Sequence, residues 1–149
     1  MRKLFTIILL AILCVNAMAY DFSAVCSTGQ TLYYNITSNV EPYTVEVTSE
    51  NATSPYYTTY PTGDLEIPET VEYNSITYSV TRIGDYAFNS CDGLTSLEIP
   101  NSVTTIGEWA FYQCSGIAGS LTLSNSVTTI GRYSFRPVSA NGEARHGSK

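Results

Sequence analysis

The residues best able to do chemistry in this sequence are a few cysteines, one histidine and the carboxylates. His146, the only histidine, lies in a polar stretch without an apolar pattern that would position it. The sequence pairs no nucleophile with a base and contains no glycine-rich phosphate loop. Two carboxylates alone are enough for a glycosidase, but no pair among the 13 acids stands out by its spacing. We therefore predict that the protein is not an enzyme, and we expect no cofactor, no metal and no small-molecule substrate.

The cysteines leave two interpretations open. Three of them follow the apolar N-terminal segment, namely Cys26, Cys91 and Cys114. An odd number does not make a closed disulfide framework, and the spacing matches no zinc motif. Cys91 and Cys114 are 23 residues apart, so they would lie either in a column of buried thiols or in a disulfide between neighbouring coils of chain. We expect free thiols, because cysteine packs well as a small apolar group.

The 23-residue spacing belongs to a longer repeat. Three segments align: SVTRIGDYAFNSCDGLTSLEIPN from residue 79, SVTTIGEWAFYQCSGIAGSLTLSN from residue 102 and SVTTIGRYSFRPV from residue 126. Isoleucine recurs at Ile83, Ile106 and Ile130, and phenylalanine recurs at Phe88, Phe111 and Phe135. A period of about 20–29 residues is typical of solenoids, in which neighbouring coils stack to cover the apolar face that each coil leaves open. The repeat therefore predicts a solenoid.

Within each coil the sequence indicates a short strand followed by a tight turn. Leu97 and Ile99 alternate with Ser96 and Glu98, which is the period-2 pattern of a half-buried strand. We expect a turn that needs freedom in φ at the glycine after each isoleucine. These glycines are Gly84, Gly107 and Gly131. Residues 85–88 then predict a short helical turn, in which the alanine and phenylalanine columns pack inward.

Two motifs carry a family resemblance. They are Ile-Gly-x-x-Ala-Phe-x-x-Cys, at residues 83–91 and 106–114, and Leu-x-Ile-Pro, at residues 97–100. Together they resemble the BspA-type leucine-rich-repeat family. The segment from Leu65 repeats the strand motif, and a predicted β-hairpin around Asn74-Ser75 is similar to the N-terminal capping region of bacterial members. The resemblance implies an α/β leucine-rich-repeat solenoid, a right-handed coil of short strands and short helical turns with a strand-rich N-terminal cap. It also implies a secreted or surface-held protein that adheres to proteins or host matrix.

The sequence divides into four expected parts. Residues 1–19 are expected to be a signal peptide, because Arg2 and Lys3 precede an apolar run and a small-x-small cleavage pattern stands at residues 17–19. An uncleaved anchor and a lipid on Cys14 are alternatives that the run length and the flanking residues disfavour. The other expected parts are a strand-rich capping region at 20–80, about two and a half leucine-rich repeats at 81–138, and a disordered tail at 139–149.

The charge of the chain narrows the class of partner. The sequence holds 13 acids and seven bases, a formal net charge of −6, and loss of residues 1–19 would remove two of the bases. Nucleic acids and anionic membrane surfaces are disfavoured, since both attract basic patches. No later apolar run approaches the roughly 20 residues that span a bilayer. We therefore expect a secreted or cell-surface protein that is not membrane-spanning and that binds a protein or matrix ligand.

Two surfaces are candidate binding sites. Outward residues of the predicted strands form a tentative ligand-binding face: Asp64, Glu66, Ser96, Glu98, Ser120 and Thr122. Repeat arrays bind along such extended faces, although the same residues also fit an ordinary solvated edge. The second candidate is an aromatic column with one ring per coil: Tyr86, Trp109 and Tyr133. We expect the rings of this column to stack on each other, since aromatic neighbours gain from contact.

Two functions other than adhesion stay open. The chain fits a purely structural capping part of a longer repeat protein, and it also fits a carbohydrate-binding module. The carbohydrate would bind in the tyrosine-rich front half, which carries Tyr33, Tyr34, Tyr43, Tyr56, Tyr57 and Tyr60. A glycosidase is disfavoured, because the acids of the repeats recur at outward positions whereas a catalytic group would be unique to one coil.

Overall fold

The computed structural model describes residues 18–117 and 121–136. Most of the expected signal peptide and the whole expected tail lie outside the described residues. The strands are β1 (Phe22–Val25), β2 (Thr31–Ser38), β3 (Thr44–Thr48), β4 (Gly63–Glu66), β5 (Thr70–Tyr73), β6 (Ile76–Ile83), β7 (Leu94–Glu98), β8 (Thr105–Ile106), β9 (Leu121–Thr122) and β10 (Thr129–Ile130). A single turn of 3-10 helix covers Ser115–Ile117.

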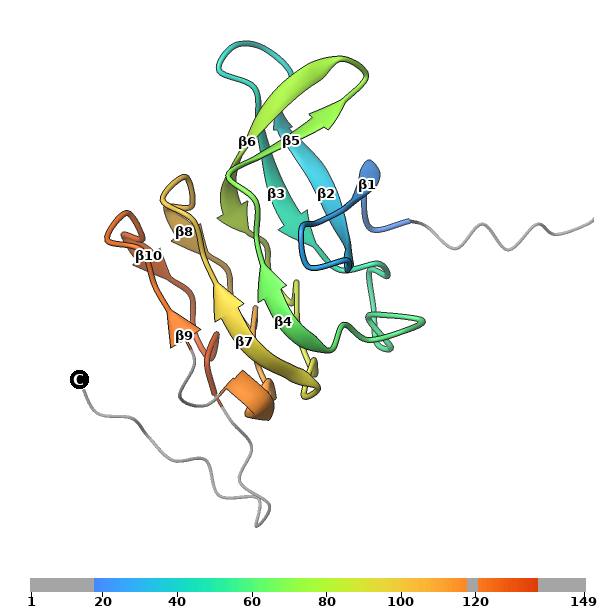
Figure 1. Ribbon diagram of the computed structural model, residues 1–149, viewed down its shortest axis with the longest axis vertical. Helices are drawn as coiled ribbons and strands as arrows, with labels where there is room; N and C mark the ends of the chain where they lie inside the picture. Colours follow the sequence, from blue (N-terminus) through green and yellow to red (C-terminus); the bar gives the residue numbers. More distant parts are fainter. Residues whose placement is uncertain (1–17, 118–120, 137–149) are drawn as a thin grey trace, which may run out of the picture.

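The strands form two sheets, and in every coil the chain passes from one sheet to the other and back (Figure 1). The larger sheet has the order β1-β2-β3-β6-β8-β10, with β5 paired to β6. Its first three strands are antiparallel, and from β3 onward the pairing through β6, β8 and β10 is parallel. The smaller sheet, β4-β7-β9, is parallel throughout. Parallel pairing of strands one repeat apart is the pattern of a solenoid, so the predicted coil is confirmed.

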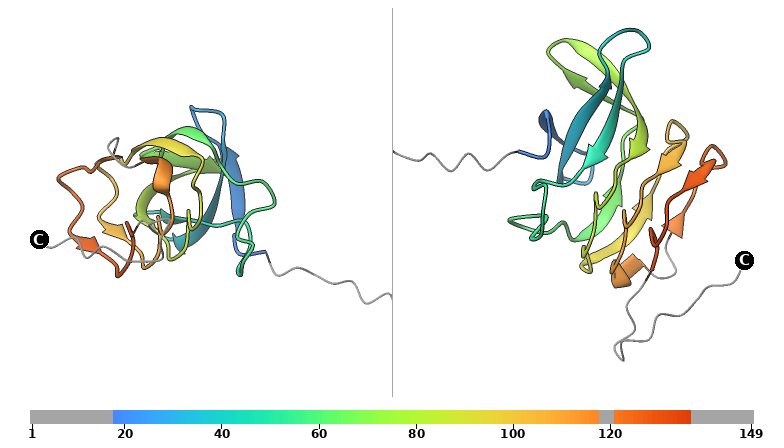
Figure 2. Two further views of the ribbon diagram at one scale, coloured as in Figure 1. Left: turned by 90° about the horizontal axis from the view of Figure 1, so that it is seen from below. Right: turned by 180° about the vertical axis from the view of Figure 1, so that it is seen from behind.

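A third wall of the solenoid consists of turns rather than strands. The amides of residues 86, 88 and 90 donate to the carbonyls of residues 108, 110 and 112 in the next coil, over 2.9, 2.7 and 2.7 Å. The next pair of coils repeats this pattern from residues 109, 111 and 113 to residues 132, 134 and 136. Figure 2 shows the coils following one another from green to red along the molecule. Each coil is therefore tied to its neighbour by backbone bonds on three sides.

The expected helical turns at residues 85–88 are wrong: the described residues contain no α-helix. Every second amide of this segment points to the next coil, so it is not available for the bond to residue i−4 that a helix needs. The left-handed φ of 59° at Tyr86 and 64° at Ser90 also breaks the helical succession. Stacking of coils thus replaces local helix formation.

The expected role of the glycine column is wrong as well. Gly84, Gly107 and Gly131 do not have a positive φ; among the described glycines only Gly29 and Gly63 do. A Cβ added to Gly107 would lie 2.6 Å from the amide nitrogen of Asp85 in the preceding coil. The column therefore holds glycine because neighbouring coils approach too closely for any side chain.

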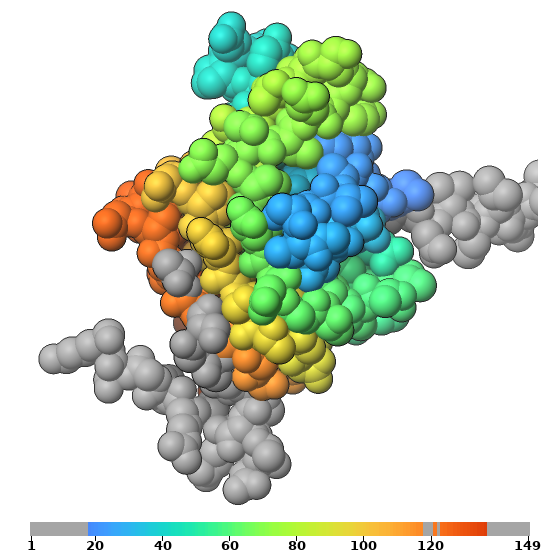
Figure 3. All heavy atoms as spheres, in the orientation of Figure 1, coloured from blue at the N-terminus to red at the C-terminus, as the bar shows by residue number. Residues whose placement is uncertain are grey.

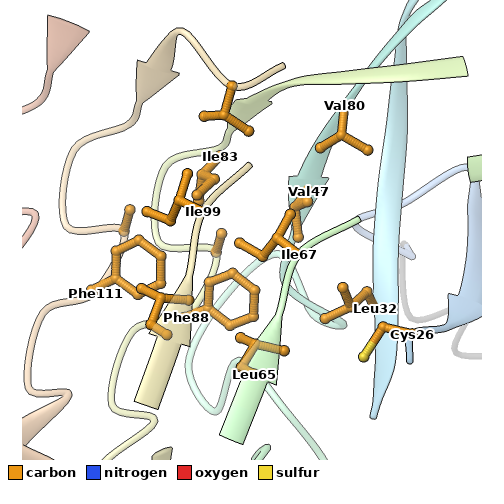
Figure 4. Close-up of a cluster of buried hydrophobic side chains, with 14 of the residues drawn as sticks. Cys26, Leu32, Val47, Leu65, Ile67, Val80, Ile83, Phe88, Ile99 and Phe111 are labelled. Carbon is orange, nitrogen blue, oxygen red and sulfur yellow. The ribbon is translucent and has the colours of Figure 1, made fainter. Parts of the chain in front are cut away.

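Phenylalanine and isoleucine columns fill the space between the walls. Phe88 and Phe111 are buried, and their ring centroids lie 5.2 Å apart in planes that differ by 7°. Phe135 continues the stack at 5.1 Å and 9°. In Figure 4 the two labelled phenylalanines lie side by side among aliphatic side chains of the strands. The inward packing predicted for the alanine and phenylalanine columns is confirmed.

The predicted hairpin before the repeats is confirmed. β5 and β6 pair antiparallel with Tyr73 opposite Ile76, and the two turn residues between them have positive φ, 51° at Asn74 and 63° at Ser75. Positive φ at both positions suits the right-handed twist of a two-residue hairpin. β6 then runs on to Ile83, across the expected boundary at residue 80, and its parallel pairing with β3 joins the front half to the coils.

Among residues 18–117 and 121–136, no helix is long and apolar enough to cross a bilayer. In the same residues, no group of three or more histidine, cysteine or acidic side chains is placed to hold a metal ion.

Candidate functional site

The predicted ligand-binding face lies on the outer side of the sheet β4-β7-β9, and we call it the strand face: Asp64, Glu66, Ser96 and Glu98. Parallel register places Asp64 beside Ser96 and Glu66 beside Glu98. Leu65 and Leu97 alternate with these residues and are 2 % exposed, so the polar side chains point outward. Asp64, Glu66 and Glu98 are exposed, and Ser96 is half-buried. The structure brings these four residues together as expected.

The last two predicted members of this face are placed only in part. Ser120 lies outside the described residues. The backbone of Thr122 pairs with Glu98, which extends the rows of the strand face into β9. The side chain of Thr122 is outside the described part of the structure, so its orientation remains a prediction.

Hydroxyl groups fix the carboxylate of Asp64 on the strand face. Oδ1 of Asp64 accepts hydrogen bonds from Oγ of Ser96 at 2.6 Å and from Oγ1 of Thr95 at 2.8 Å. These two donors favour the charged form, Ser96 more than Thr95, and they hold the pKa of Asp64 below its usual value. Asp64 therefore presents a fixed negative charge at the start of β4.

The β1–β2 turn covers the outer edge of β4. Nε2 of Gln30 donates to the carbonyls of Thr62, at 2.9 Å, and Asp64, at 2.7 Å. Oγ of Ser27 donates to Oε2 of Glu66 at 2.7 Å. In Figure 3 the blue β1–β2 segment lies directly against green β4. These contacts protect an edge that would otherwise offer unpaired backbone groups, and they limit the strand face on this side.

Sequence reasoning missed Ser27 and Gln30, because they contact β4 across 32 to 39 residues of a non-repeating segment. It also missed Glu69. With Glu66 and Glu98, this residue lines a hollow of about 340 Å³ at the end of the strand face. The three acids come from two coils. Acidic side chains thus gather at the C-terminal end of the strand face, a clustering that only the register of the coils reveals.

The aromatic column stacks largely on itself. Tyr86 and Trp109 lie 6.2 Å apart at 6°, and Trp109 and Tyr133 lie 4.6 Å apart at 40°. Tyr56, which the sequence did not connect with the column, extends it at 5.5 Å and 15° from Tyr86. Because near-parallel rings face one another, solvent meets mainly their edges. The guanidinium of Arg136 lies 5.2 Å from the ring centroid of Tyr133 at the far end.

The cysteine column is buried and not bonded. Cys26, Cys91 and Cys114 are free thiols, which confirms the preferred interpretation. Sγ of Cys114 donates to the carbonyl of Phe88 at 3.0 Å. A hydrogen bond with the Cys114 thiol, together with burial, raises the pKa of Cys91 well above its usual range. A buried thiol that stays protonated is a packing group and a poor nucleophile.

The tyrosines of the front half divide into core and surface residues. Tyr34 and Tyr57 are buried, with 1 % and 4 % of their surface exposed. The hydroxyl of Tyr57 donates to the backbone carbonyl of Ala87, so this residue ties the front half to the first coil. The expectation that Tyr57 is a surface tyrosine is therefore wrong. Tyr33, Tyr57 and Tyr60 line a second hollow, of about 490 Å³.

The similarity to known proteins covers the repeats and also the segment before them. The family described as the BspA type leucine-rich repeat region (6 copies) matches residues 65–143, more than half of the chain. No curated protein matches the chain. The solved structure of a leucine-rich repeat protein from Bacteroides ovatus is 34% identical, with a TM-score of 0.60, over 78% of this chain and 27% of that one.

Two further solved structures share the fold. A leucine-rich cell surface protein from Faecalibacterium prausnitzii is 27% identical, with a TM-score of 0.55, over 76% of this chain and 27% of that one. A leucine-rich repeat protein from Bacteroides capillosus is 25% identical, with a TM-score of 0.52, over 68% of this chain and 67% of that one. The chain thus spans about a quarter of the length of the first two relatives. The likeness confirms a leucine-rich-repeat fold, here without the α-helical turns that were expected.

Proposed function

The chain belongs to the BspA type leucine-rich-repeat family, and from this premise we propose that it is a secreted or cell-surface adhesion protein whose strand face binds a partner protein. Repeats of this family point to protein–protein interaction. Repeat arrays offer extended surfaces built from the same position of successive coils, which suits recognition of another macromolecule. To this general function the proposal adds the strand face as the binding surface, a secreted or cell-surface location, and adhesion as the role.

One observation carries the choice of surface: the register of β4 and β7 sets acidic and hydroxyl side chains in adjacent rows on an exposed sheet. The three described arginines lie elsewhere, Arg82 in β6 and Arg132 and Arg136 in the last described turn. A surface of one sign with fixed carboxylates favours partners of complementary charge and speeds their association. The aromatic column is the weaker candidate, since its rings cover each other's faces.

Two observations support an extracellular location. Arg2 and Lys3, the apolar run and the cleavage pattern at residues 17–19 together fit an export signal. One relative of similar fold is described as a cell surface protein. If the proposal holds, the exported protein begins at Tyr20, which mass spectrometry of the mature N-terminus checks. Retention of Met1 in the exported protein contradicts it.

The binding experiment reverses charge on the strand face. The double variant Glu66→Lys/Glu98→Lys is compared with the parent on a panel of extracellular-matrix proteins by surface plasmon resonance. We expect binding to weaken at least about tenfold at physiological salt, because each lysine meets a like charge on the partner. Both positions are exposed, so the free energy of unfolding should change by less than about 0.5 kcal/mol.

A matched control places the same charge change off the strand face. Glu41→Lys/Glu72→Lys alters two exposed acids, one in the β2–β3 loop and one in β5. Equal loss of binding in both double variants would show a general effect of net charge and overturn the assignment to the strand face. Binding that appears only when the chain is joined to further coils would favour the capping function instead.

A further inference from the structure

The hollow of about 490 Å³ in the front half has a composition unlike the rest of the surface. We call it the tyrosine hollow: Tyr33, Tyr57, Tyr60 and Glu50. Its remaining lining is neutral and polar or proline, with Gln30 and Thr62 on the side of β4 and no lysine, arginine or histidine. Its volume is within the range of about 300–1,000 Å³ that is usual for small-ligand pockets. It combines aromatic rings with one carboxylate.

The rings of the tyrosine hollow do not stack. The Tyr57 ring lies 6.0 Å from Tyr33 at 54° and 5.5 Å from Tyr60 at 56°. Tyr57 is buried and anchored through its hydroxyl, whereas Tyr33 and Tyr60 are half-buried on either side of it. Tyr57 thus forms the buried part of the lining, and Tyr33 and Tyr60 form its more exposed walls. This arrangement contrasts with the aromatic column, in which near-parallel rings cover each other.

The carboxylate of Glu50 is held in place at this hollow. Its two oxygens accept hydrogen bonds from the amide of Thr58, at 2.6 Å, and from the hydroxyl of Thr58, at 3.0 Å. Burial, and after it the nearby charge of Glu50, raises the pKa of Tyr33 above its usual value. Within the described part of the chain, both ion pairs belong to Arg82 and none involves Glu50. Glu50 therefore brings an uncompensated negative charge to an aromatic surface.

The tyrosine hollow opens beside the strand face. Gln30 lines the hollow and also donates to the carbonyl of Asp64 at the start of β4. Thr62 lines the hollow directly before β4 begins. Figure 3 shows the β1–β2 segment and the segment before β4 meeting next to the green strand. The tyrosine hollow therefore lies next to the strand face, with Gln30 between the two.

We propose that the tyrosine hollow binds the cationic head of a lysine or arginine side chain from the partner polypeptide. The face of an aromatic ring attracts a cation, and the attraction grows where water is partly excluded. Glu50 adds a direct charge interaction, and the neighbouring strand face attracts the rest of a basic segment. The inference rests on the proposed function, because it names the chemistry of the partner that the strand face recognises.

The test uses the full chain and a small probe. Nα-acetyl-lysine methylamide is titrated into the ¹⁵N-labelled protein, and its uncharged counterpart Nα-acetyl-norleucine methylamide is titrated in parallel. We expect the lysine probe to shift the amide resonances of residues 57–60 and 62 in a saturable way and the norleucine probe to bind about fivefold to tenfold more weakly. Raised salt should weaken the binding of the lysine probe alone.

Two variants and two controls locate the effect. Glu50→Gln keeps the shape and an acceptor for Thr58 but removes the charge, and Tyr60→Leu removes one wall. Each should weaken binding of the lysine probe about fivefold. The controls are Glu41→Gln and Tyr133→Leu, an exposed acid and a tyrosine 39% exposed, both away from the hollow. They should leave binding of the lysine probe unchanged. A preserved amide spectrum shows that each variant is folded.

Three outcomes would overturn the inference. Equal binding of the norleucine probe would make the hollow an apolar site, and equal loss in Glu41→Gln would make the attraction a general effect of charge. Shifts produced by the neutral sugar cellobiose, but not by the lysine probe, would make it a saccharide site. The proposed function fails separately, through the strand-face variants: a probe that binds the hollow while those variants keep full partner binding leaves the hollow standing and refutes the strand face.

Discussion

The front half, residues 18–62, and the repeats, residues 81–136, use the same polar and aromatic residue types in different ways. In the repeats, the rings of the phenylalanine and aromatic columns meet their own counterparts one coil away, as Phe88 meets Phe111. In the front half, each contact is made once, as where Tyr57 donates to the carbonyl of Ala87. Repetition produces regular stacking. Contacts without repetition produce a hollow with oblique rings and a lone carboxylate.

This difference separates stability from recognition. In a repeated column, each side chain already contacts the equivalent side chain of the next coil. Little of its surface therefore remains free to contact a ligand. A contact made once leaves unmatched groups, such as the charge of Glu50. The strand face combines the two, because its positions repeat while its edge is set by Gln30 and Ser27 from the front half. Binding chemistry therefore concentrates where the two regions meet.

The largest expected effect comes from breaking the repeated core. Phe111 is 1 % exposed and stacks on a ring on each side, at 5.2 and 5.1 Å. Phe111→Ala should lower the free energy of unfolding by about 3–5 kcal/mol, because it opens a cavity between two coils. Urea denaturation followed by circular dichroism measures this change. Phe135→Ala is the control, and it should cost less, since Phe135 is only half-buried.

The same variant tests whether the two regions unfold together. β3 of the front half pairs directly with β6 of the first coil, so one sheet runs through both. We expect fluorescence of Trp109, in the repeats, and circular dichroism of the whole chain to report a single transition. Separate transitions, with the front half surviving Phe111→Ala, would show that the regions are independent folding units.

The repeats were largely predictable from the sequence, because equal spacing gives Ile83 and Ile106 the same buried environment, whereas Ile130 in the last coil is 52% exposed. The period alone placed Ile106 and Phe111 in the core, and alternation placed Asp64 and Glu98 on the surface. What failed was the local conformation at residues 85–88. Propensity suggested a helical turn there, whereas bonds to the next coil and the positive φ of Tyr86 produce a chain of turns. The sequence pattern of one coil does not show that backbone hydrogen bonds to the next coil compete with helical ones.

The front half was predictable only as strands, and its part in the candidate site was not. Gln30 donates to the carbonyls of Thr62 and Asp64, and Thr58 donates to the carboxylate of Glu50. These contacts do not follow the sequence repeat, so the repeat does not predict them. Tyr57 looked like its neighbours in the sequence, but it is buried. Long-range contacts that occur only once leave no periodic signal in the sequence. The sequence therefore gives the residue types, and the fold is needed to show which residues are in contact.

A smaller effect separates two reasons for glycine. Gly107 has no positive φ, but a Cβ there would lie 2.6 Å from the backbone of Asp85, whereas Gly29 has open space and a φ of 88°. Gly107→Ala should therefore cost about 1–3 kcal/mol through overpacking. Gly29→Ala should cost about 1 kcal/mol through backbone strain. Urea denaturation of both variants measures the free energies.

A third substitution distinguishes the two causes. Gly29→Asn should cost less than Gly29→Ala, since asparagine tolerates the left-handed region. Gly107→Asn should cost more than Gly107→Ala, because a larger side chain meets the same backbone. The same order of costs at both positions would contradict the distinction between the close approach of coils and backbone conformation.

The smallest expected effect concerns the pKa of Asp64, at the edge of the strand face where the front half contacts β4. Hydroxyl groups of Ser96 and Thr95 donate to Asp64 and lower its pKa below the usual 3.8. Because the folded-state pKa is depressed, the stabilisation is fully present above the ordinary value and is lost as the pH falls through the folded-state value. The carboxyl ¹³C resonance of Asp64, followed by NMR from neutral to acid pH, should therefore titrate below 3.8.

Ser96→Ala should raise the titration midpoint of Asp64 more than Thr95→Val, since Ser96 contributes more to the shift. Ser27→Ala removes a hydroxyl that bonds to Glu66 instead, so it should leave Asp64 unchanged. A midpoint that stays low in Ser96→Ala/Thr95→Val would show that the repeat hydroxyls do not hold this charge in place.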